Sequence, residues 1–407
     1  MPKLIYLGVL RIPTEKAHGL QIMQNCEAFA NAGYDVELWA ARRLNTPEMR
    51  QIKDAFAFYG VEHNFRIKRL PLLDLMPLAR GNLKIERVFF YIQIITYIVS
   101  MLLVMLFTKA DVYYSRDENI LVALSLIKPR QKLAYEPHTI RPSKWGRWLQ
   151  VQAANRSGSV IPITGKLRDD LASDGVDFNK MMVAHDGVRA SRFANLPDRN
   201  AARQQVGWPA DAYIVGYMGQ LKTMNMDKGT GLLVKAMARI PDGYVAIVGG
   251  PTEAAEKLRQ MWIGLGRPED HFLYSGQVTP DDVPLYLRAF DVGVLPLPWT
   301  PHFAYYTSAL KLFEYMAAGC TVVASDLPSA QEVLQHDQTA ILFKHEDIES
   351  LTLALLRLHD DLRLRDTLSD YAYTTVMAHY TWDARAQAIR QHIEAQQGKT
   401  IGKGPIA

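Results

Sequence analysis

The sequence predicts an α/β protein built from two doubly wound domains, each a parallel sheet covered by helices. Short apolar runs alternate with longer segments of helical spacing from the first residues onward. Such alternation is typical of parallel strands joined by crossover helices. A length of 407 residues exceeds one comfortable hydrophobic core. A polar stretch over residues 186–211, which contains two prolines, is the predicted linker between the domains.

The first series of elements predicts the N-terminal domain. Between its first two strands, a segment of helical spacing ends at Gly33, a residue type that favours the left-handed backbone found at helix ends. The first strand of this domain is predicted from a short apolar run over residues 3–9, and further strands are predicted over residues 35–41, 110–115, 132–138 and 159–164.

The second series begins near Ala212 and predicts a C-terminal domain of the same kind. A helix is expected over residues 305–320, soon after the strand 291–297. Thr307 or Ser308 could cap this helix, because a hydroxyl accepts a hydrogen bond from an otherwise unpaired amide. The strands of this series are predicted over residues 212–219, 243–250, 272–278, 291–297, 320–326 and 339–344.

The helix expected over residues 305–320 carries a cation and a carboxylate, Lys311 and Glu314, among apolar positions. Ligands of open α/β sheets bind at the carboxyl ends of strands, and a helix N-terminus there attracts phosphate. Lys311, one turn in, could face phosphates, and Glu314, about two turns in, could accept hydrogen bonds from a ribose diol. The alternative is an ordinary helix surface pair, since Lys and Glu three residues apart are common.

The loop after the strand 212–219 is a second candidate for phosphate binding. Gly219 ends the strand and lets the backbone approach a ligand, and Lys228 with Gly229 begins the next helix. A flexible loop with a surface lysine is the alternative. The spacing of a P-loop and the glycine triplet of a dinucleotide-binding turn are both absent from the sequence, so neither motif explains the candidate site.

Residues 88–107 form an apolar segment of about twenty residues without a charge, long enough to cross a bilayer. Three interpretations are open: a buried crossover helix between parallel strands, a transmembrane span, or a helix lying partly in a membrane face. Nearby, residues 141–148 mix Arg and Lys with Trp145 and Trp148. This mixture suits an anionic lipid interface, and a solvated loop or helix face is the alternative.

The charge of the chain is unevenly distributed. The formal net charge is +4, but residues 1–190 hold 26 Lys and Arg against 18 Asp and Glu. A basic first half suggests an anionic surface or acceptor, with solubility alone as the equally open alternative. Cys26 and Cys320 fall in different predicted domains, so we expect no disulfide and a reducing cytoplasm. The first residues do not read as a signal peptide.

Several motifs, in order along nearly the whole chain, resemble family-4 glycosyltransferases with the GT-B fold. The one that corresponds to the donor site is "SALKLFEYMAAGCTVVASDLPSAQEVL", and the others are "AHGLQ", "MMVAHDGVRASRF", "VGYMGQL…DKG", "YVAIVGG" and "YTWDARAQAI". The resemblance implies two Rossmann-like domains facing across a cleft. We expect an acceptor-side domain over residues 1–190, a donor-binding domain over 191–380, and a last helix over about 381–407 packing on the first.

The same resemblance implies a retaining enzyme that moves a sugar from a nucleotide-diphosphate sugar to an acceptor. Polysaccharide, glycolipid or cell-envelope glycan synthesis is the expected setting, in the cytoplasm and peripheral to the membrane, with a sugar or lipid-linked acceptor and no nucleic acid. No cofactor or metal is expected, because such proteins neutralise the diphosphate themselves. The acidic run at residues 168–170 falls in a predicted helix and is not taken as a metal site.

Roles carry over only where the motifs match. The resemblance implies that Glu314 binds the ribose, that Lys228 contacts the diphosphate, and that His138 lies close to the transferred sugar; these three are the expected catalytic residues. Gly19 would let the first helix approach the donor, and the turn at 185–188 would be structural. The remaining expected donor-binding residues are Gly219, Gln220, Tyr306, Ser308, Ala309, Leu310 and Lys311.

Two positions depart from the family pattern. Tyr306 stands where a glutamate usually touches the sugar ring, and Gln220 stands where an arginine usually faces the diphosphate. Lys222 or Lys311 could replace that charge. A nucleotide-sugar epimerase of the same fold and a catalytically silent partner subunit therefore stay as alternatives, and a two-lobed solute-binding protein is disfavoured by the lack of an export signal.

Overall fold

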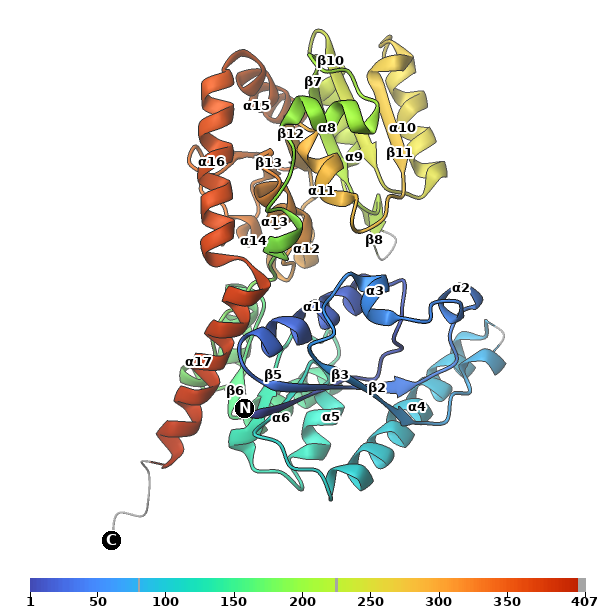
Figure 1. Ribbon diagram of the computed structural model, residues 1–407, viewed down its shortest axis with the longest axis vertical. Coiled ribbons are helices and arrows are strands. Elements are labelled where there is room, and N and C mark those ends of the chain that lie inside the picture. The colour runs from blue at the N-terminus through green and yellow to red at the C-terminus, as the bar shows by residue number, and fades with distance from the viewer. Residues whose placement is uncertain (80, 224–225, 402–407) are drawn as a thin grey trace. The chain divides into compact units, whose positions relative to one another are not determined.

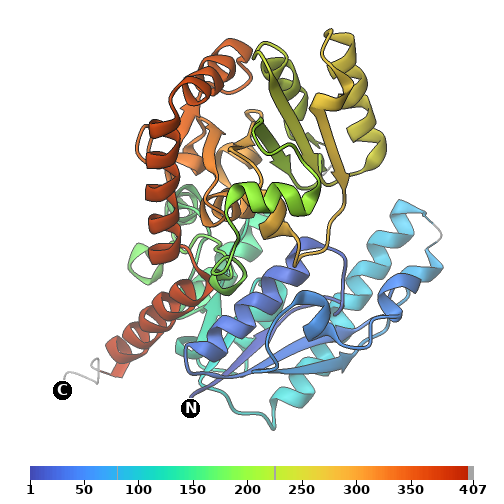
Figure 2. The same cartoon turned by 45° about the horizontal axis from the view of Figure 1, so that its top comes forward.

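The computed structural model describes residues 1–79, 81–223 and 226–401 (Figures 1 and 2). The chain forms two compact units, one of Met1–His185 with Trp382–Ala407 and the other of Asp186–Thr381. Each unit contains a six-stranded sheet whose paired strands are all parallel. The predicted class, two doubly wound α/β domains, is confirmed. The chain passes between the units twice, and Figure 1 shows the second passage where helix α16 (Leu362–His379) leads into α17 (Trp382–Ile401).

The sheet of the first unit has the strand order β3-β2-β1-β4-β5-β6. The chain runs outward from β1 in one direction and then returns to start β4 on the other side, which makes a topological switch point between β1 and β4. Strand β3 was not predicted, because it is an exposed edge strand with the polar sequence RIKRLP rather than an apolar run. The strands are β1 (Lys3–Leu7), β2 (Asp35–Arg42), β3 (Arg66–Pro71), β4 (Val112–Ser115), β5 (Leu133–Tyr135) and β6 (Ser159–Val160).

Helices cover both faces of this sheet. Figure 1 shows α4, α5 and α6 on one face and α1 and α3 on the other, as right-handed crossovers in opposite directions require. Helix α17 packs against α1 and so completes the first unit from the far end of the chain. The helices are α1 (Ala17–Asn31), α2 (Pro47–Arg50), α3 (Ala55–Tyr59), α4 (Leu83–Met105), α5 (Glu118–Leu124), α6 (Lys144–Arg156) and α7 (Gly165–Ser173), with short 3₁₀ turns at 76–78, 130–132 and 178–180.

The sheet of the second unit has the order β11-β10-β7-β12-β13-β14, with its switch point between β7 and β12. Its six strands are β7 (Tyr213–Met218), β10 (Gly243–Val248), β11 (Phe272–Gly276), β12 (Val292–Leu295), β13 (Thr321–Ser325) and β14 (Ile341–Phe343), beside a small hairpin of β8 (Lys222–Thr223) and β9 (Met226–Asp227). Its helices are α8 (Arg199–Val206), α9 (Thr230–Met237), α10 (Thr252–Gly264), α11 (Val283–Arg288), α12 (Pro301–Tyr305), α13 (Leu310–Ala317), α14 (Pro328–Gln331), α15 (Ile348–Asp360) and α16, with 3₁₀ turns at 190–192 and 269–271.

The polar stretch over residues 186–211 is not a free linker, which corrects the prediction. Its helix α8 packs on α11, and the guanidinium of Arg203 is buried with its Nη2 2.5 Å from Asp291 Oδ2. Asp291 also accepts the amide of Ile214 at 2.8 Å. A buried ion pair needs such satisfied partners. The segment looks polar in sequence because its contribution to the core is a charged network rather than an apolar face.

Helix α4 connects β3 to β4, as expected of a crossover helix, but it is far less buried than a core helix. It is the one helix among the described residues that is long and apolar enough to cross a membrane. Only 28% of its most apolar eighteen residues are buried. Length and composition alone are weak evidence for a span, and the helix is part of the layer that covers the first sheet.

Candidate functional site

Glycines follow two adjacent strands, β7 and β10, beside the switch point of the second unit. The backbone of Gly219 has a φ of +131°, which L-residues rarely adopt. Its amide donates to Val248 O at 2.8 Å. A Cβ on Gly249 would lie only 2.1 Å from Gly219 O, so the turn after β10 passes directly against the turn after β7. Both turns therefore require glycine, and they leave backbone rather than side chains at this edge of the sheet.

Lys228 is placed by the glycine that follows it. Gly229, with a φ of +78°, precedes α9, and a Cβ there would lie 1.8 Å from Pro296 O, just beyond β12. The Lys228 amide donates to Leu221 O at 3.2 Å, which ties the lysine to the loop after β7. The backbone of Lys228 is thus anchored near the carboxyl ends of β7 and β12, where a ligand of an open α/β sheet binds.

The predicted helix over residues 305–320 is two helices. The five-residue α12 ends at Tyr305, and α13 begins only at Leu310. The intervening residues carry two hydroxyls that act elsewhere: Thr307 Oγ1 donates to His302 O at 2.9 Å, and Ser308 Oγ accepts the Asp186 amide at 2.8 Å. Neither hydroxyl caps α13, contrary to the prediction. Because the helix starts later than expected, Lys311 is its second residue and Glu314 its fifth.

The N-terminus of α13 is left without a side-chain cap. Ala309 is the N-cap residue, and it has no side chain that could accept from the first amides of the helix. Alanine is a poor residue at this position because it offers those amides no side-chain acceptor. Ala309, Leu310 and Lys311 are each partly exposed. An uncapped helix start of this kind suits an anionic group that accepts from the free amides.

Three cationic or titratable side chains gather at this edge of the second unit. Burial, and then the charge of Lys311, lower the pKa of Lys228. Burial, and then the charge of Lys228, lower the pKa of His302. Burial is the larger cause of both shifts, and the second cause is repulsion between the positive charges at this edge. A polyanion such as a diphosphate would relieve that repulsion.

Glu314 is the carboxylate of this cluster. Its Oε2 lies 2.5 Å from Lys311 Nζ, and both side chains are partly exposed. The sequence allowed either a ligand site or an ordinary helix surface pair. The ion pair does form, and it lies on the same helix whose first amides have no side-chain cap. A carboxylate has more lone pairs than one lysine uses, so Glu314 can also accept from hydroxyls of a ligand.

The two departures from the family pattern have different surroundings. Gln220 is exposed, and its carbonyl accepts the Tyr217 hydroxyl at 3.0 Å. Of the two lysines offered as substitutes, Lys311 reaches Gly219: a Cβ on that glycine would meet Lys311 Cε at 3.4 Å. Lys222 is exposed on the small β8-β9 hairpin. Tyr306 ends α12, with its amide donating to His302 O at 3.0 Å, and is partly exposed.

Sequence reasoning missed the residue that fixes α13 to the sheet. Tyr315 is fully buried, and its hydroxyl accepts the amide of Met218, the last residue of β7, at 2.9 Å. Its ring lies over Gly293 in β12, where a Cβ would meet the ring at 2.7 Å. A tyrosine among apolar helix positions and a glycine inside a strand are the signals that could have indicated this contact.

The expected residues of the first unit lie in two places. A Cβ on Gly19 would clash with Thr14 and with the hydroxyl of Tyr59, which itself donates to Thr14 O at 2.9 Å. Gly19 therefore allows the loop before α1 to fold tightly onto Tyr59. His138 follows β5, with Nε2 2.6 Å from Oε1 of the fully buried Glu136.

The acidic run at residues 168–170 and the turn at 185–188 make contacts within the fold. The acidic residues Asp169 and Asp170 lie on α7 and pair with Arg168 and Lys166 of the same helix. Within the described ranges, no three His, Cys, Asp or Glu side chains gather as a metal site requires. A Cβ on Gly187 would lie 2.6 Å from Tyr380 O, so this turn is packed against returning chain.

The two doubly wound domains, with an uncapped helix and a lysine pair at the switch point of the second, define the GT-B class of fold. Over 98% of this chain, the fold matches sucrose-phosphate synthase from Thermosynechococcus elongatus, with 19% identity, full coverage of that chain and a TM-score of 0.73. It also matches Anabaena HepE in complex with UDP over 97% of this chain and 100% of that one, with 18% identity and a TM-score of 0.71. At these identities the likeness establishes the fold.

Residues 212–361, about three quarters of the second unit, match the family model described as Glycosyl transferases group 1. The second unit is therefore a domain of the glycosyltransferase type. One curated relative, the phosphatidyl-myo-inositol mannosyltransferase of Mycolicibacterium smegmatis, is 28% identical over 57% of this chain and 54% of its own length. The chain spans between 54% and 59% of the length of the curated relatives that it matches first.

Proposed function

We propose that the chain is a retaining glycosyltransferase that moves a sugar from a nucleotide-diphosphate sugar to an acceptor. The observation that carries the proposal is the uncapped start of α13, with Lys311 and Lys228 beside it, inside a domain of the glycosyltransferase type. Free amides and two cations can neutralise a diphosphate, and they would stabilise the charge that grows on the leaving nucleotide. Retention of the anomeric configuration is proposed from the family resemblance.

Glu314 gives the site its preference for a ribonucleotide. Its carboxylate lies one turn from the phosphate-binding helix start and can accept hydrogen bonds from the 2′- and 3′-hydroxyls. Structures of HepE have been solved with UDP and with UDP-glucose, which supports a nucleotide-sugar donor for this fold. The acceptor is proposed to be a lipid-linked or glycan sugar of the cell envelope, met at the cytoplasmic membrane surface, in keeping with the basic first half of the chain.

The proposed function is tested by measuring nucleotide release from a panel of nucleotide sugars, with soluble and lipid-linked acceptors and without any. Release that depends on both a donor and an acceptor is expected. Binding of nucleotide diphosphates without acceptor-dependent release would favour the silent partner subunit, and interconversion of the nucleotide sugar itself would favour the epimerase. The anomer of the product, followed by NMR, distinguishes retention from inversion.

Transfer is expected to proceed without a divalent metal. Lys228, Lys311 and the amides of α13 supply the positive charge that a bound metal would otherwise bring to the diphosphate. The measurement is turnover in the presence of a chelator, with and without added magnesium or manganese. Loss of activity in the chelator that a divalent ion restores would contradict this part of the proposal.

A further inference from the structure

Helix α4 has a continuous apolar stripe on its outward side. Its members recur every three or four residues and are each between 53% and 61% exposed: Val88, Tyr91, Ile95, Val99, Leu103 and Leu106. We call these six residues the outer face of α4. Single exposed apolar side chains are common on soluble proteins, whereas a contiguous stripe marks an interaction site. The stripe extends over nearly the whole helix, so its exposure to water is unfavourable.

The inward side of α4 is part of the fold of the first unit. The hydroxyl of Tyr97 donates to Trp39 O in β2 at 2.7 Å, and Tyr97 itself is fully buried. Met101 and Met105 are likewise buried. Thr96 Oγ1 accepts the Leu73 amide at 3.1 Å. A helix held by these contacts cannot cross a bilayer without unfolding the sheet, so whatever covers its outer face must approach from outside and lie along it.

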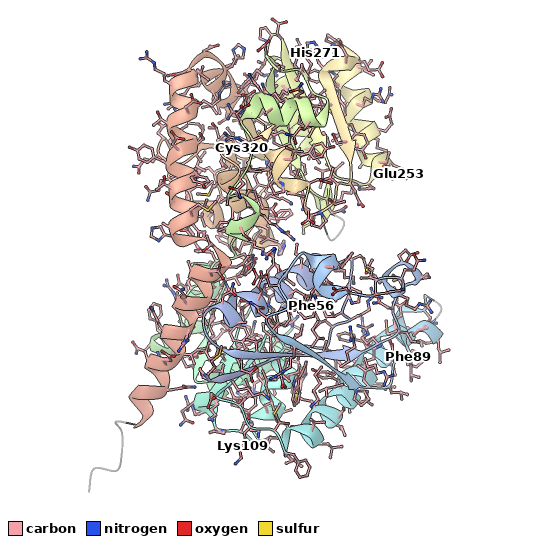
Figure 3. The ribbon with its side chains drawn as sticks, viewed as in Figure 1. Phe56, Phe89, Lys109, Glu253, His271 and Cys320 are labelled. Carbon is pink, nitrogen blue, oxygen red and sulfur yellow. The ribbon has the colours of Figure 1, made fainter. Side chains whose placement is uncertain are left out.

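The charges around the outer face are mainly positive. Lys84 and Arg87 lie at the start of α4, and Lys109 follows its end; Figure 3 labels Lys109 and, within the helix, Phe89. Residues 83–156, which form this covering layer with β4 and β5, contain eleven Lys and Arg against five Asp and Glu. Two of those five, Glu118 and Glu136, are buried and pair with Arg141 and Arg116, which leaves nine basic residues against three acidic ones. The layer therefore presents a positive surface to any partner.

Two tryptophans on α6 belong to the same covering layer. Trp145 is 70% exposed and Trp148 is 49% exposed, and their rings stack with centroids 4.7 Å apart. Figure 1 shows α6 on the same face of the sheet as α4. Tryptophan is the residue type that favours the boundary between headgroups and acyl chains. The helical layer with α4 and α6 in the first unit thus combines an apolar stripe, flanking basic residues and exposed tryptophans.

We propose that the outer face of α4 docks on an anionic lipid bilayer, with the helix lying parallel to the membrane plane. The apolar stripe would enter the headgroup–acyl boundary while Lys84, Arg87 and Lys109 contact anionic headgroups. A second copy of the chain is a poorer occupant, because an antiparallel pair of α4 helices would place Lys109 against Lys84 and Arg87. The proposal does not depend on the transferase chemistry, since it concerns a different part of the chain.

Vesicle binding tests this surface with the full chain. Co-sedimentation is measured with phosphatidylcholine vesicles with and without phosphatidylglycerol, at low and high salt, for the native chain and the variants Ile95→Glu and Leu103→Glu. We expect salt-sensitive binding to anionic vesicles that falls at least tenfold in each variant. Leu353→Glu, which adds the same charge at a 65% exposed leucine of α15, is the matched control and should bind as the native chain does.

Two results would overturn the membrane assignment. One is native-like vesicle binding by both outer-face variants, and the other is absence of binding by the native chain to anionic vesicles at low salt. Light scattering of the same samples completes the test, because a native dimer that Ile95→Glu converts to a monomer without changing vesicle binding would assign the face to self-association instead. Thermal melting checks folding, and Ile95→Ser replaces any variant that melts early.

A second, independent observation concerns the carboxylate behind His138. Glu136 follows β5 and has no exposed surface. Its Oε1 lies 2.6 Å from His138 Nε2 and 2.7 Å from Arg116 Nε, and its Oε2 lies 3.0 Å from Arg385 Nη2. Asn25 and the Tyr114 hydroxyl also donate to Oε2. One buried carboxylate therefore joins β4, β5, α1 and α17 and holds the histidine expected near the transferred sugar.

These contacts determine the ring state of His138. Burial works to raise the pKa of Glu136, but Arg116 and Arg385 overcome it and hold the pKa well below its usual range. An ionised carboxylate only accepts hydrogen bonds, so Nε2 of His138 must carry the proton.

We infer that Glu136 is a positioning residue that holds His138 in its Nε2-protonated form. Arg385 stabilises the ionised state of Glu136, so α17 contributes to the site without touching the substrate. The kinetic part of this inference rests on the proposed transferase function, whereas the ring state of His138 can be measured without any turnover.

Glu136→Gln tests the inference with two readouts. Nitrogen NMR of the His138 ring should show the Nε2-protonated form in the native chain and a mixture of forms in the variant. Turnover should fall at least tenfold with unchanged nucleotide affinity, should recover in part in Glu136→Asp, and should fall no further when Glu136→Gln is added to His138→Ala. Glu118→Gln, which alters another buried carboxylate of this unit, bound by Arg141, is the matched control.

The outcomes separate this inference from the proposed function. An Nε2-protonated ring that Glu136→Gln leaves unchanged would overturn the positioning role, whatever the activity. Equal loss of turnover in Glu118→Gln and Glu136→Gln would do the same, because it would indicate general damage to the fold. A changed ring state in a chain that transfers no sugar would support the positioning role and contradict the transferase. If Glu136→Gln fails to fold, the ring state of His138 and the turnover are measured in Arg385→Lys instead. Arg390→Lys is then the control.

Discussion

Replacement of His138 by alanine is expected to lower the turnover of sugar transfer by about two to four orders of magnitude, the range for a positioned acid–base or hydrogen-bonding group. Nucleotide affinity should change little, because His138 belongs to the first unit and the elements proposed to bind phosphate belong to the second. Steady-state turnover and calorimetric titration with a nucleotide diphosphate measure the two quantities separately.

His63 provides the control for this prediction. It lies in the same unit and also pairs with a carboxylate, Nε2 to Asp54 Oδ2 at 3.2 Å, but its side chain is 66% exposed. His63→Ala should leave turnover within about twofold of the native chain, as surface substitutions usually do. If His138→Ala keeps the native turnover, His138 has only a structural role after β5.

Replacement of Lys228 by alanine is expected to lower turnover by about 10²- to 10³-fold, comparable to the removal of one preorganised electrostatic group. The loss should exceed the loss of nucleotide-diphosphate affinity, because negative charge grows on the leaving group during transfer. Affinity for the nucleoside alone should stay unchanged. Lys235→Ala, on the helix α9 that follows Lys228, is the control that removes a positive charge elsewhere in this unit.

Glu314→Gln complements that measurement at the other end of the nucleotide. Loss of a hydrogen bond to a charged group costs about 1.5–3 kcal/mol, so ribonucleotide affinity should fall about 10- to 150-fold. The fall should shrink with the 2′,3′-dideoxy analogue. Because Glu314 also pairs with Lys311, the same titrations in a Lys311→Met background separate the ribose contact from release of the lysine.

The opposite pattern would contradict the ribose assignment. If Glu314 were only a partner for Lys311, its substitution would weaken the ribonucleotide and the dideoxy analogue equally, and the melting temperature would fall. If Lys228 were only a loop residue, Lys228→Ala and Lys235→Ala would behave alike in turnover.

Central strands were predictable from the sequence, because a strand buried on both faces is an apolar run that needs no context to recognise. All six strands of the second sheet, and every strand of the first sheet except β3, were predicted. Edge strand β3 and helix α8 were not, since their polar residues face solvent or satisfy one another. Their burial depends on partners such as Asp291, which are distant in sequence.

The candidate site was predictable in its residue types and less so in its geometry. A lysine and a glutamate near a helix start were visible, but the start itself moved to Leu310 because Ser308 and Thr307 hydrogen-bond elsewhere. The choice of Lys311 over Lys222 beside Gly219 required the turn conformation. Glu136 was overlooked, although a glutamate at the end of the apolar run "LAYEPH" is itself unusual.

The return of the chain to the first unit through α17 has a consequence for biosynthesis. Glu136 emerges early, but Arg385, one of its two arginine partners, is translated only after the whole of the second unit, residues 186–381. At about 5–20 residues per second, that interval lasts on the order of ten to forty seconds. During it, the second unit is the one that can fold completely on the ribosome. Until then, Glu136 of the nascent first unit lacks the Arg385 partner that helps to compensate its burial. Chaperones would therefore bind the first unit in this incomplete state.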